Sequence, residues 1–223
     1  MDTIVAVASP PGGGLRGVVR LSGPRAVALA RAVVDVPLDA DRRAVPVTLT
    51  RPVRLPATAL VLRAPRSYTR EDVVELHLPG SPPVLRALVE ELCALGARPA
   101  RPGEFTLRAF LSGRLDLAQA EAVERLIAAS SEAEARAAAD QLHGSFSAPL
   151  RAIEDDLLNL AADVEAAIDF VDQDIEIVST EAVVRRVSAI EDRLAALLAR
   201  TGTRRLENAR PTVALLGKPG VGK

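Results

Sequence analysis

Apolar and polar positions follow two different periodic patterns along the chain. In residues 1–115, short apolar and β-branched runs are separated by turn residues, a pattern that predicts strands. One helix should begin at Pro24, and another carries apolar residues at helical spacing. The expected strands are Thr3–Ala8, Gly17–Leu21, Val45–Thr50, Ala57–Arg63 and Val73–Leu78, and the expected helices are 24–34 and Pro83–Leu95. This half is predicted to be a mixed α/β domain.

The second pattern, which begins near residue 118, has the period of a helix. Residues 118–142 are rich in Ala and Glu, and two later stretches repeat apolar residues with a period near 3.6. Three long helices are expected, with breaks at Gly144 and 169–174, and together they predict a helical domain. The two stripes are Leu150, Ile153, Leu157, Leu160, Ala161, Val164 and Ile168, then Val183, Val187, Ile190, Leu194 and Leu197.

A third pattern occupies the last residues. The apolar strand candidate 212–216 runs directly into Gly217–Lys223, which fits G-x-x-x-x-G-K. In such a loop the backbone N–H groups face the phosphates and the lysine adds charge. The expected nucleotide-binding residues are Gly217, Gly220, Val221, Gly222 and Lys223. Since the Ser or Thr that would ligate Mg²⁺ does not follow, we expect the front part of a larger nucleotide-binding protein.

Composition narrows the protein class. Hydrophobic residues make up 48% and charged residues 26% of the 223, as in folded globular proteins. The single cysteine, Cys93, allows no intrachain disulfide and fits a reducing compartment. Neither a signal peptide nor an apolar run of about 20 residues is present, so we expect a cytoplasmic protein with no membrane partner. The sequence assigns no catalytic residue and no metal ligand.

Charge is unevenly spread. Residues 1–115 hold 16 arginines and 10 acidic residues, whereas residues 116–223 hold 12 basic and 19 acidic residues. The first half could therefore attract an anionic ligand, and ordinary surface charge is the equal alternative.

A dense motif joins the two halves: Pro102-Gly103-Glu104-Phe105-Thr106, then Arg108-Ala109-Phe110-Leu111, then Gly113 to Ala122. Phe105 and Phe110 should be apolar anchors, and the nearby charged residues can pair locally (Arg108, Arg114, Asp116 and Glu121). With four further blocks, this motif resembles the MnmE (TrmE) family of bacterial tRNA-modifying GTPases. The blocks are Asp2–Ala6 with Pro10–Gly12, Arg20–Gly23, Tyr68–Thr69 with Glu71–Leu76, and Ala166–Phe170.

The resemblance implies an α+β architecture in three parts. Residues 1–116 would form an aminomethyltransferase-like domain that binds 5-formyl-tetrahydrofolate and makes a homodimer. Residues 117–208 would be the first part of a helical domain, and residues 209–223 the start of a GTPase domain. In the family the full-length protein uses GTP and Mg²⁺. With an MnmG (GidA) flavoprotein it installs a carboxymethylaminomethyl-type group on the wobble uridine of tRNA, with folate as the one-carbon donor.

Carried over to this sequence, the resemblance implies a folate site that includes Arg20, Glu75 and Arg114. A carboxylate can accept hydrogen bonds from the N–H edge of a pterin, and arginines can bind the glutamyl carboxylates of the tail. The alternative for each of these residues is a local salt bridge.

Four departures from the family pattern bear on these expectations. Arg114 stands where the family has Lys, and Arg70 where it has Gly. The segment His77–Pro82 replaces a His-Gly-Gly loop near the predicted folate pocket. Gly220 replaces the Asn that helps bind potassium in the family, so the resemblance does not carry potassium dependence over to this chain.

Two other functions remain open. A degenerate, non-catalytic relative could act as a dimerisation or scaffold module, as the changes at 77–82 and at Gly220 would suggest. A folate-dependent aminomethyl-transfer enzyme could use the same fold, although the attached phosphate loop argues against it.

Overall fold

The computed structural model describes residues 2–169 and 178–201. Contacts divide the chain into two compact units, Met1–Glu124 and Arg125–Lys223. The first unit is a mixed α/β fold and the second is helical, as the sequence predicts. The expected strand 212–216 and the phosphate loop lie outside the described residues.

The first unit is built on one six-stranded sheet with the order β3-β4-β5-β2-β1-β6. Neighbouring strands are antiparallel except for β1 and β6, which are parallel. The strands are β1 (Ile4–Val7), β2 (Gly14–Ser22), β3 (Ala44–Leu49), β4 (Leu55–Leu62), β5 (Val73–Gly80) and β6 (Arg98–Pro99).

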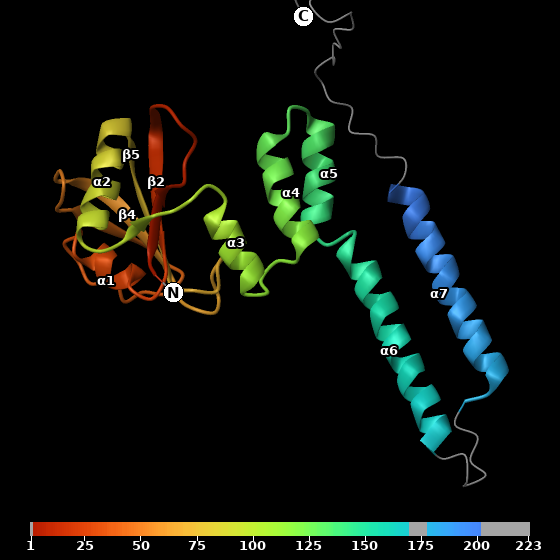
Figure 1. The fold of residues 1–223 in the computed structure, drawn as a ribbon. Coiled ribbons are helices and arrows are strands. Elements are labelled where there is room, and N and C mark those ends of the chain that lie inside the picture. Colours follow the sequence, from red (N-terminus) through yellow and green to blue (C-terminus); the bar gives the residue numbers. More distant parts are fainter. Residues whose placement is uncertain (1, 170–177, 202–223) are drawn as a thin grey trace, which may run out of the picture. The chain divides into compact units, whose positions relative to one another are not determined.

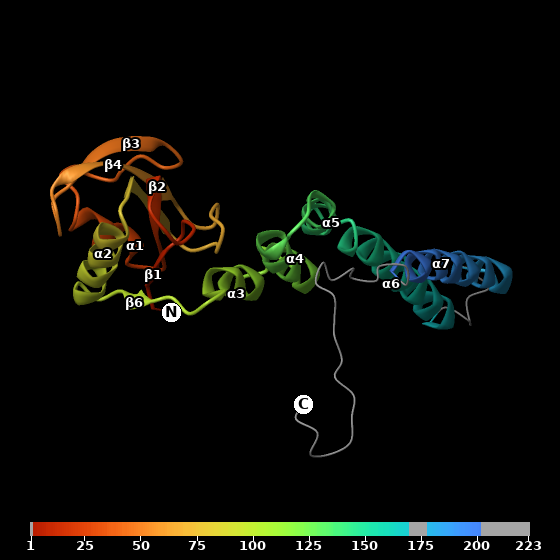
Figure 2. The same cartoon turned by 90° about the horizontal axis from the view of Figure 1, so that it is seen from above.

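Two helices cover one face of this sheet. Helices α1 (Ala26–Arg31) and α2 (Pro82–Ala94) lie against the same face, and the sheet curves around them (Figures 1 and 2). The core between them is made of aliphatic side chains, since the chain has few aromatic residues. Members of this core on the two central strands include Val19, Leu21, Val74, Leu76 and Leu78.

Strand β5 is longer than the sequence predicts. The expected strand ends at Leu78, whereas β5 continues through residues 79 and 80, and α2 begins at Pro82. Gly80 pairs with Gly14 across the strands, and a Cβ on Gly80 would lie only 2.6 Å from the carbonyl oxygen of Gly14. Glycine at position 80 therefore lets the strands approach and extends the pairing.

After the sheet the first unit continues through α3 (Glu104–Leu111) into α4 (Leu117–Ala128). Asp116 and Gln119 cap the N-terminus of α4 through two hydrogen bonds. The Gln119 N–H donates to Asp116 Oδ1 at 2.9 Å, and the Asp116 N–H donates to Gln119 Oε1 at 3.0 Å. This arrangement is a capping box, with the acidic residue in the place of Ser or Thr.

Among residues 117–169 and 178–201, the structure shows one more helix than expected. The predicted continuous helix 118–142 is divided into α4 and α5 (Glu132–Leu142). The break is explained by Ser131, whose hydroxyl accepts a hydrogen bond from the Glu134 N–H at 3.2 Å. The Glu134 carboxylate in turn accepts from the Ser130 N–H at 2.8 Å, so a cap begins the new helix.

The other two helices match the predicted stripes. Helices α6 (Ser147–Asp169) and α7 (Thr180–Thr201) contact each other, with Ile153, Leu160 and Ile190 buried. Arg186 Nη1 donates to Asp163 Oδ2 at 2.5 Å, and Arg193 pairs with Asp156. As the residue numbers rise on one helix they fall on the other, so the pair is antiparallel.

Candidate functional site

Arg20 and Glu75 lie opposite each other on the adjacent strands β2 and β5. The Arg20 Nε donates to Glu75 Oε1 at 2.8 Å, and their side chains are 30% and 16% exposed. The structure thus brings together two of the three residues expected to bind folate. An ion pair this sheltered from solvent is stronger than one at the open surface.

The strand alternation places this pair on the sheet face away from α1 and α2. Val19 and Leu21 are buried in the helix-covered core, and so are Val74 and Leu76. Because successive side chains of a strand point to opposite faces, Arg20 and Glu75 lie on the other face. A polar pair on that face is reachable by a ligand without opening the core.

Two further side chains complete the surroundings of this pair. His77 Nε2 lies 3.1 Å from Glu75 Oε2, on the same face of β5. The guanidinium carbon of Arg20 lies 5.6 Å from the ring centroid of Phe105, within the range of a cation–π contact. Phe105 belongs to α3, so this helix contributes one wall of the candidate site.

Helix α3 is fixed to the first unit by a network around Arg108, which is 8% exposed. Its Nη1 donates to both carboxylate oxygens of Glu71, at 3.1 and 3.0 Å, and its Nη2 donates to Asp2 Oδ1 at 2.6 Å. The expected local pairing of Arg108 is present only as a longer contact of 3.4 Å to Glu104. The main partners are far away in sequence, because the segments just before β1 and β5 meet α3 in the fold.

Arg98 extends the network. It donates to Asp2 Oδ2 at 2.6 Å and to Glu104 Oε1 at 2.6 Å. These hydrogen bonds lower the pKa of Asp2 to about 2 and that of Glu104 to about 2. Both carboxylates remain ionised at neutral pH, so α3 stays anchored beside Arg20.

Two family models match the chain. The one described as GTP-binding protein TrmE N-terminus matches residues 3–114, and the one described as MnmE helical domain matches residues 117–208. This chain belongs to the MnmE (TrmE) family.

Several curated proteins named tRNA modification GTPase MnmE are similar to the chain. The protein from Alkalilimnicola ehrlichii is 45% identical over 99% of this chain and 50% of its own length. The proteins from Thermus thermophilus and Koribacter versatilis are 44% and 42% identical over the whole of this chain and 52% and 51% of theirs. The chain therefore spans about half the length of the curated relatives it matches.

Arg114, the third residue expected in the MnmE folate site, follows α3 in a turn. Its N–H donates to the Ala109 carbonyl at 2.8 Å, and its side chain is exposed. The ion pairs and hydrogen bonds described for Arg20 and Glu75 do not involve that side chain. Its role in folate binding stays a prediction.

The nucleotide-binding residues expected in the MnmE phosphate loop fall outside the described residues, and so does the potassium-related position Gly220. In residues 2–169 and 178–201, His, Cys, Asp and Glu side chains form no group of three that could hold a metal ion. No helix in those ranges combines the length and apolarity needed to cross a bilayer.

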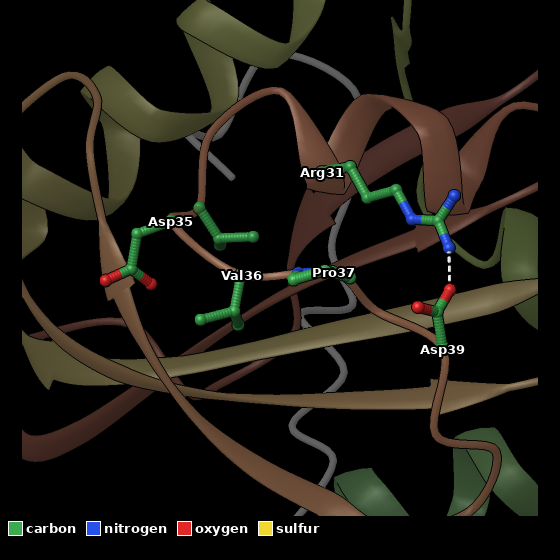
Figure 3. Close-up of a pocket in the computed structure, with 6 residues that line it drawn as sticks. Arg31, Asp35, Val36, Pro37 and Asp39 are labelled. Carbon is green, nitrogen blue, oxygen red and sulfur yellow. Dashed lines mark hydrogen bonds and ion pairs between the residues drawn. The ribbon is translucent and has the colours of Figure 1, made fainter.

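A hollow of about 360 Å³ lies elsewhere on the first unit, beside the end of α1 (Figure 3). Arg31, Asp35 and Asp39 line it together with Val34, Val36 and Pro37. Its charged groups already have partners: Arg31 pairs with Asp39, and Asp35 Oδ1 accepts from the Thr48 N–H at 2.7 Å. These contacts hold the 31–39 turn in place and leave no unpartnered charge for a ligand.

Reasoning from the sequence missed the place of His77 beside Glu75. A signal was present, because residues two apart in a strand share a face. The expected strand Val73–Leu78 already contained both residues. The partners of Arg108 carried no such signal, since Asp2 and Glu71 approach it only through the tertiary fold.

Proposed function

We propose that the first unit binds a reduced folate, 5-formyl-tetrahydrofolate, with Arg20, Glu75 and Arg114 among its ligand-binding residues. The observation that carries the proposal is the Arg20–Glu75 pair at 2.8 Å on the sheet face away from α1 and α2, with Phe105 against the guanidinium. The pair offers a donor group and an acceptor group side by side.

The pair has groups for either end of a folate, although the two ends are too far apart for one molecule to place both of them here. Arg20 uses its Nε for Glu75, and its two η nitrogens can bind a ligand carboxylate through parallel N–H bonds. Each oxygen of Glu75 accepts one hydrogen bond and has a second lone pair for the N–H groups of a pterin. The cationic Arg114 would add attraction for the negatively charged tail.

The wider role follows from family membership and from the name of the relatives. We propose that this chain is the N-terminal portion of a tRNA modification GTPase. GTP and Mg²⁺ would be bound through Gly217, Gly220, Val221, Gly222 and Lys223 with the remainder of a GTPase domain. The protein would act in the cytoplasm as a homodimer, with an MnmG (GidA)-like flavoprotein, on the wobble uridine of tRNA.

Calorimetry on the whole 223-residue chain tests folate binding. We expect 5-formyl-tetrahydrofolate to bind, and Glu75→Ala to weaken binding at least about tenfold, because Arg20 loses its anchor and the ligand its acceptor. Glu91→Ala is the matched control, since Glu91 pairs with Arg51 at 3.4 Å on a different part of the unit. A chain that is folded by circular dichroism and binds no reduced folate would overturn the proposal.

The tRNA role is tested in a cell that carries the full-length gene. Glu75→Ala should reduce wobble-uridine modification, whereas Glu91→Ala should leave it unchanged. Normal modification with Glu75→Ala would instead support the scaffold function, in which the folate site has no part.

A further inference from the structure

On the sheet face away from α1 and α2, one row of side chains is buried. Ile4, Ser22 and Val73 pair across β1, β2 and β5, and each is at most 1% exposed. Ser22 lies two residues from Arg20 on the same strand, so the row shares the face of the candidate site. The three residues are not members of the core beneath α1 and α2, so another part of the first unit covers them.

Helix α3 and the loop 67–71 lie over this part of the face. In both views α3 is on the other side of β2 from α2 (Figures 1 and 2). The hydroxyl oxygens of Tyr68 in the loop and Thr106 in α3 are 3.0 Å apart. Arg70 Nη1 donates to the carbonyl of Ser112, just after α3, at 3.1 Å. The loop therefore holds the helix near both of its ends.

Glu71 joins this helix to the buried row. Its Oε2 accepts from the Ser22 hydroxyl at 2.6 Å and from Arg108 Nη1 at 3.0 Å, and its Oε1 accepts from the same nitrogen at 3.1 Å. The side chains of Glu71 and Arg108 are only 16% and 9% exposed, so these charge-assisted hydrogen bonds are sheltered from solvent. Because Ser22 gives its proton to Glu71, Thr69 is the donor in the 2.7 Å contact with Ser22 Oγ.

The same sides of α3 and β2 meet a second time at the candidate site. Phe105 and Arg108 are three residues apart in α3, so they share one side of the helix. Ser22 and Arg20 share one face of β2. Arg108 is joined to Ser22 through Glu71, and the Phe105 ring centroid lies 5.6 Å from the Arg20 guanidinium carbon. The place of the Phe105 ring therefore depends on the link that Glu71 makes beside it.

We propose that Glu71 is a positioning residue of the folate site, and that it acts through Phe105. Glu71 holds α3 at the distance from β2 that keeps the Phe105 ring against Arg20. With its Nε bound to Glu75 and the ring beside it, the guanidinium is oriented before the ligand arrives, so less entropy is lost on binding. The inference rests on the proposed folate function and adds two residues on which its affinity depends.

Calorimetry with 5-formyl-tetrahydrofolate on the whole chain tests the role of Glu71. Glu71→Gln keeps the size of the side chain but replaces a carboxylate oxygen near Arg108 by an amide nitrogen, which weakens the link. We expect the affinity to fall about fivefold, since the ligand must then order the guanidinium itself. Ser22→Ala breaks the link at its strand end without removing a charge, and it should weaken binding by a similar factor.

Phe105→Leu identifies the residue through which Glu71 acts. Leucine keeps an apolar side chain but lacks the aromatic ring, so we expect the affinity to fall about fivefold here too. Because both residues act through one contact, the double variant with Glu71→Gln should also lose about fivefold. Independent effects would multiply to a loss of roughly twenty-five-fold. A residue that only stabilised the fold would not show this coupling.

Arg63→Ala is the matched control. Arg63 Nη1 donates to Asp72 Oδ2 at 2.9 Å, so the variant breaks an ion pair between the segments that follow β4 and precede β5. It should keep the wild-type affinity, even where urea unfolding shows a loss of stability. If Glu71→Gln does not fold, Ser22→Ala with Phe105→Leu provides the same test of coupling.

The outcomes separate this inference from the folate function. Unchanged affinity in the folded Glu71→Gln and Ser22→Ala variants, or independent effects in the double variant, would overturn the positioning role and leave the folate site standing. Absence of binding in the folded wild-type chain would contradict the folate function itself and the role of Glu71 with it.

Discussion

Arg70 adopts a left-handed backbone conformation, with φ of 60°. A side chain at such a position crowds the backbone, which costs about 1 kcal/mol relative to glycine. A backbone conformation of this kind favours glycine, the residue expected here from the family resemblance. Arg70 gains a partial offset, because its Nη1 donates to the Ser112 carbonyl at the end of α3 at 3.1 Å.

Substituting Arg70 by Gly and by Ala isolates the backbone effect, since both variants lose the contact with Ser112. We expect Arg70→Gly to be more stable than Arg70→Ala by about 1 kcal/mol in urea unfolding. At Arg136, inside α5, the order should reverse, with Ala more stable than Gly by about 1 kcal/mol. The same order of stability at both positions would contradict the left-handed assignment.

The carboxylates around Arg98 predict a specific sensitivity to acid. Asp2 and Glu104 have pKa values lowered to about 2 by hydrogen bonds from Arg98, below the values near 4 expected in an unfolded chain. The contribution of these two carboxylates to the free energy of unfolding is fully present above their pKa values in the unfolded chain. It is lost as the pH falls toward 2. The free energy of unfolding should therefore decrease between about pH 5 and pH 2.

In Arg98→Ala the free energy of unfolding should decrease less steeply across that pH range. The reason is that Asp2 and Glu104, without Arg98, titrate closer to their values in the unfolded chain. Arg86→Ala, at an exposed position of α2, serves as the control and should keep the wild-type slope. Equal slopes in all three proteins would show that Arg98 does not set these pKa values.

At the scale of elements, the division between α4 and α5 depends on Ser131. Its hydroxyl caps α5 by accepting from the Glu134 N–H at 3.2 Å. Ser131→Ala should destabilise the helical unit by about 1 kcal/mol, the usual cost of losing an N-cap. Ser188→Ala, at an exposed position within α7, should not destabilise it. Thermal unfolding followed by circular dichroism at 222 nm provides the comparison, and equal losses in the two variants would argue against the cap.

The elements also show how far a sequence can predict this structure. Local patterns were sufficient to predict strands β4 and β5, which contain Ala59, Val61 and Val74. They were also sufficient for helices α6 and α7, because the apolar residues of each element repeat with its period. The two-residue β6 could not be predicted, since it is a strand only by pairing with β1. At the site, the resemblance provided Arg20 and Glu75, whereas the contacts of Arg108 depend on tertiary approach.

At the scale of the molecule, the two units have separate cores. The first is centred on the sheet and α1 and α2, whereas Ile153, Leu160 and Ile190 are buried in the second. A ligand that binds only the native state of one unit stabilises that unit by mass action. Folate bound beside Arg20 should therefore protect the first unit and, if the cores unfold independently, leave the second unchanged.

Hydrogen exchange measures both units in one experiment. With 5-formyl-tetrahydrofolate at a hundred times its Kd, amides of β2 and β5 that exchange through unfolding of the unit should gain about 2.7 kcal/mol of protection, or about a hundredfold slower exchange. Amides of α6 and α7 should exchange at the same rate with and without ligand. Glu75→Ala at the same ligand concentration should lose most of the added protection, while Glu91→Ala should retain it. Equal protection of α6 and α7 in the wild-type chain would mean that the two units unfold together, and that ligand binding in the first is felt directly by the helical unit.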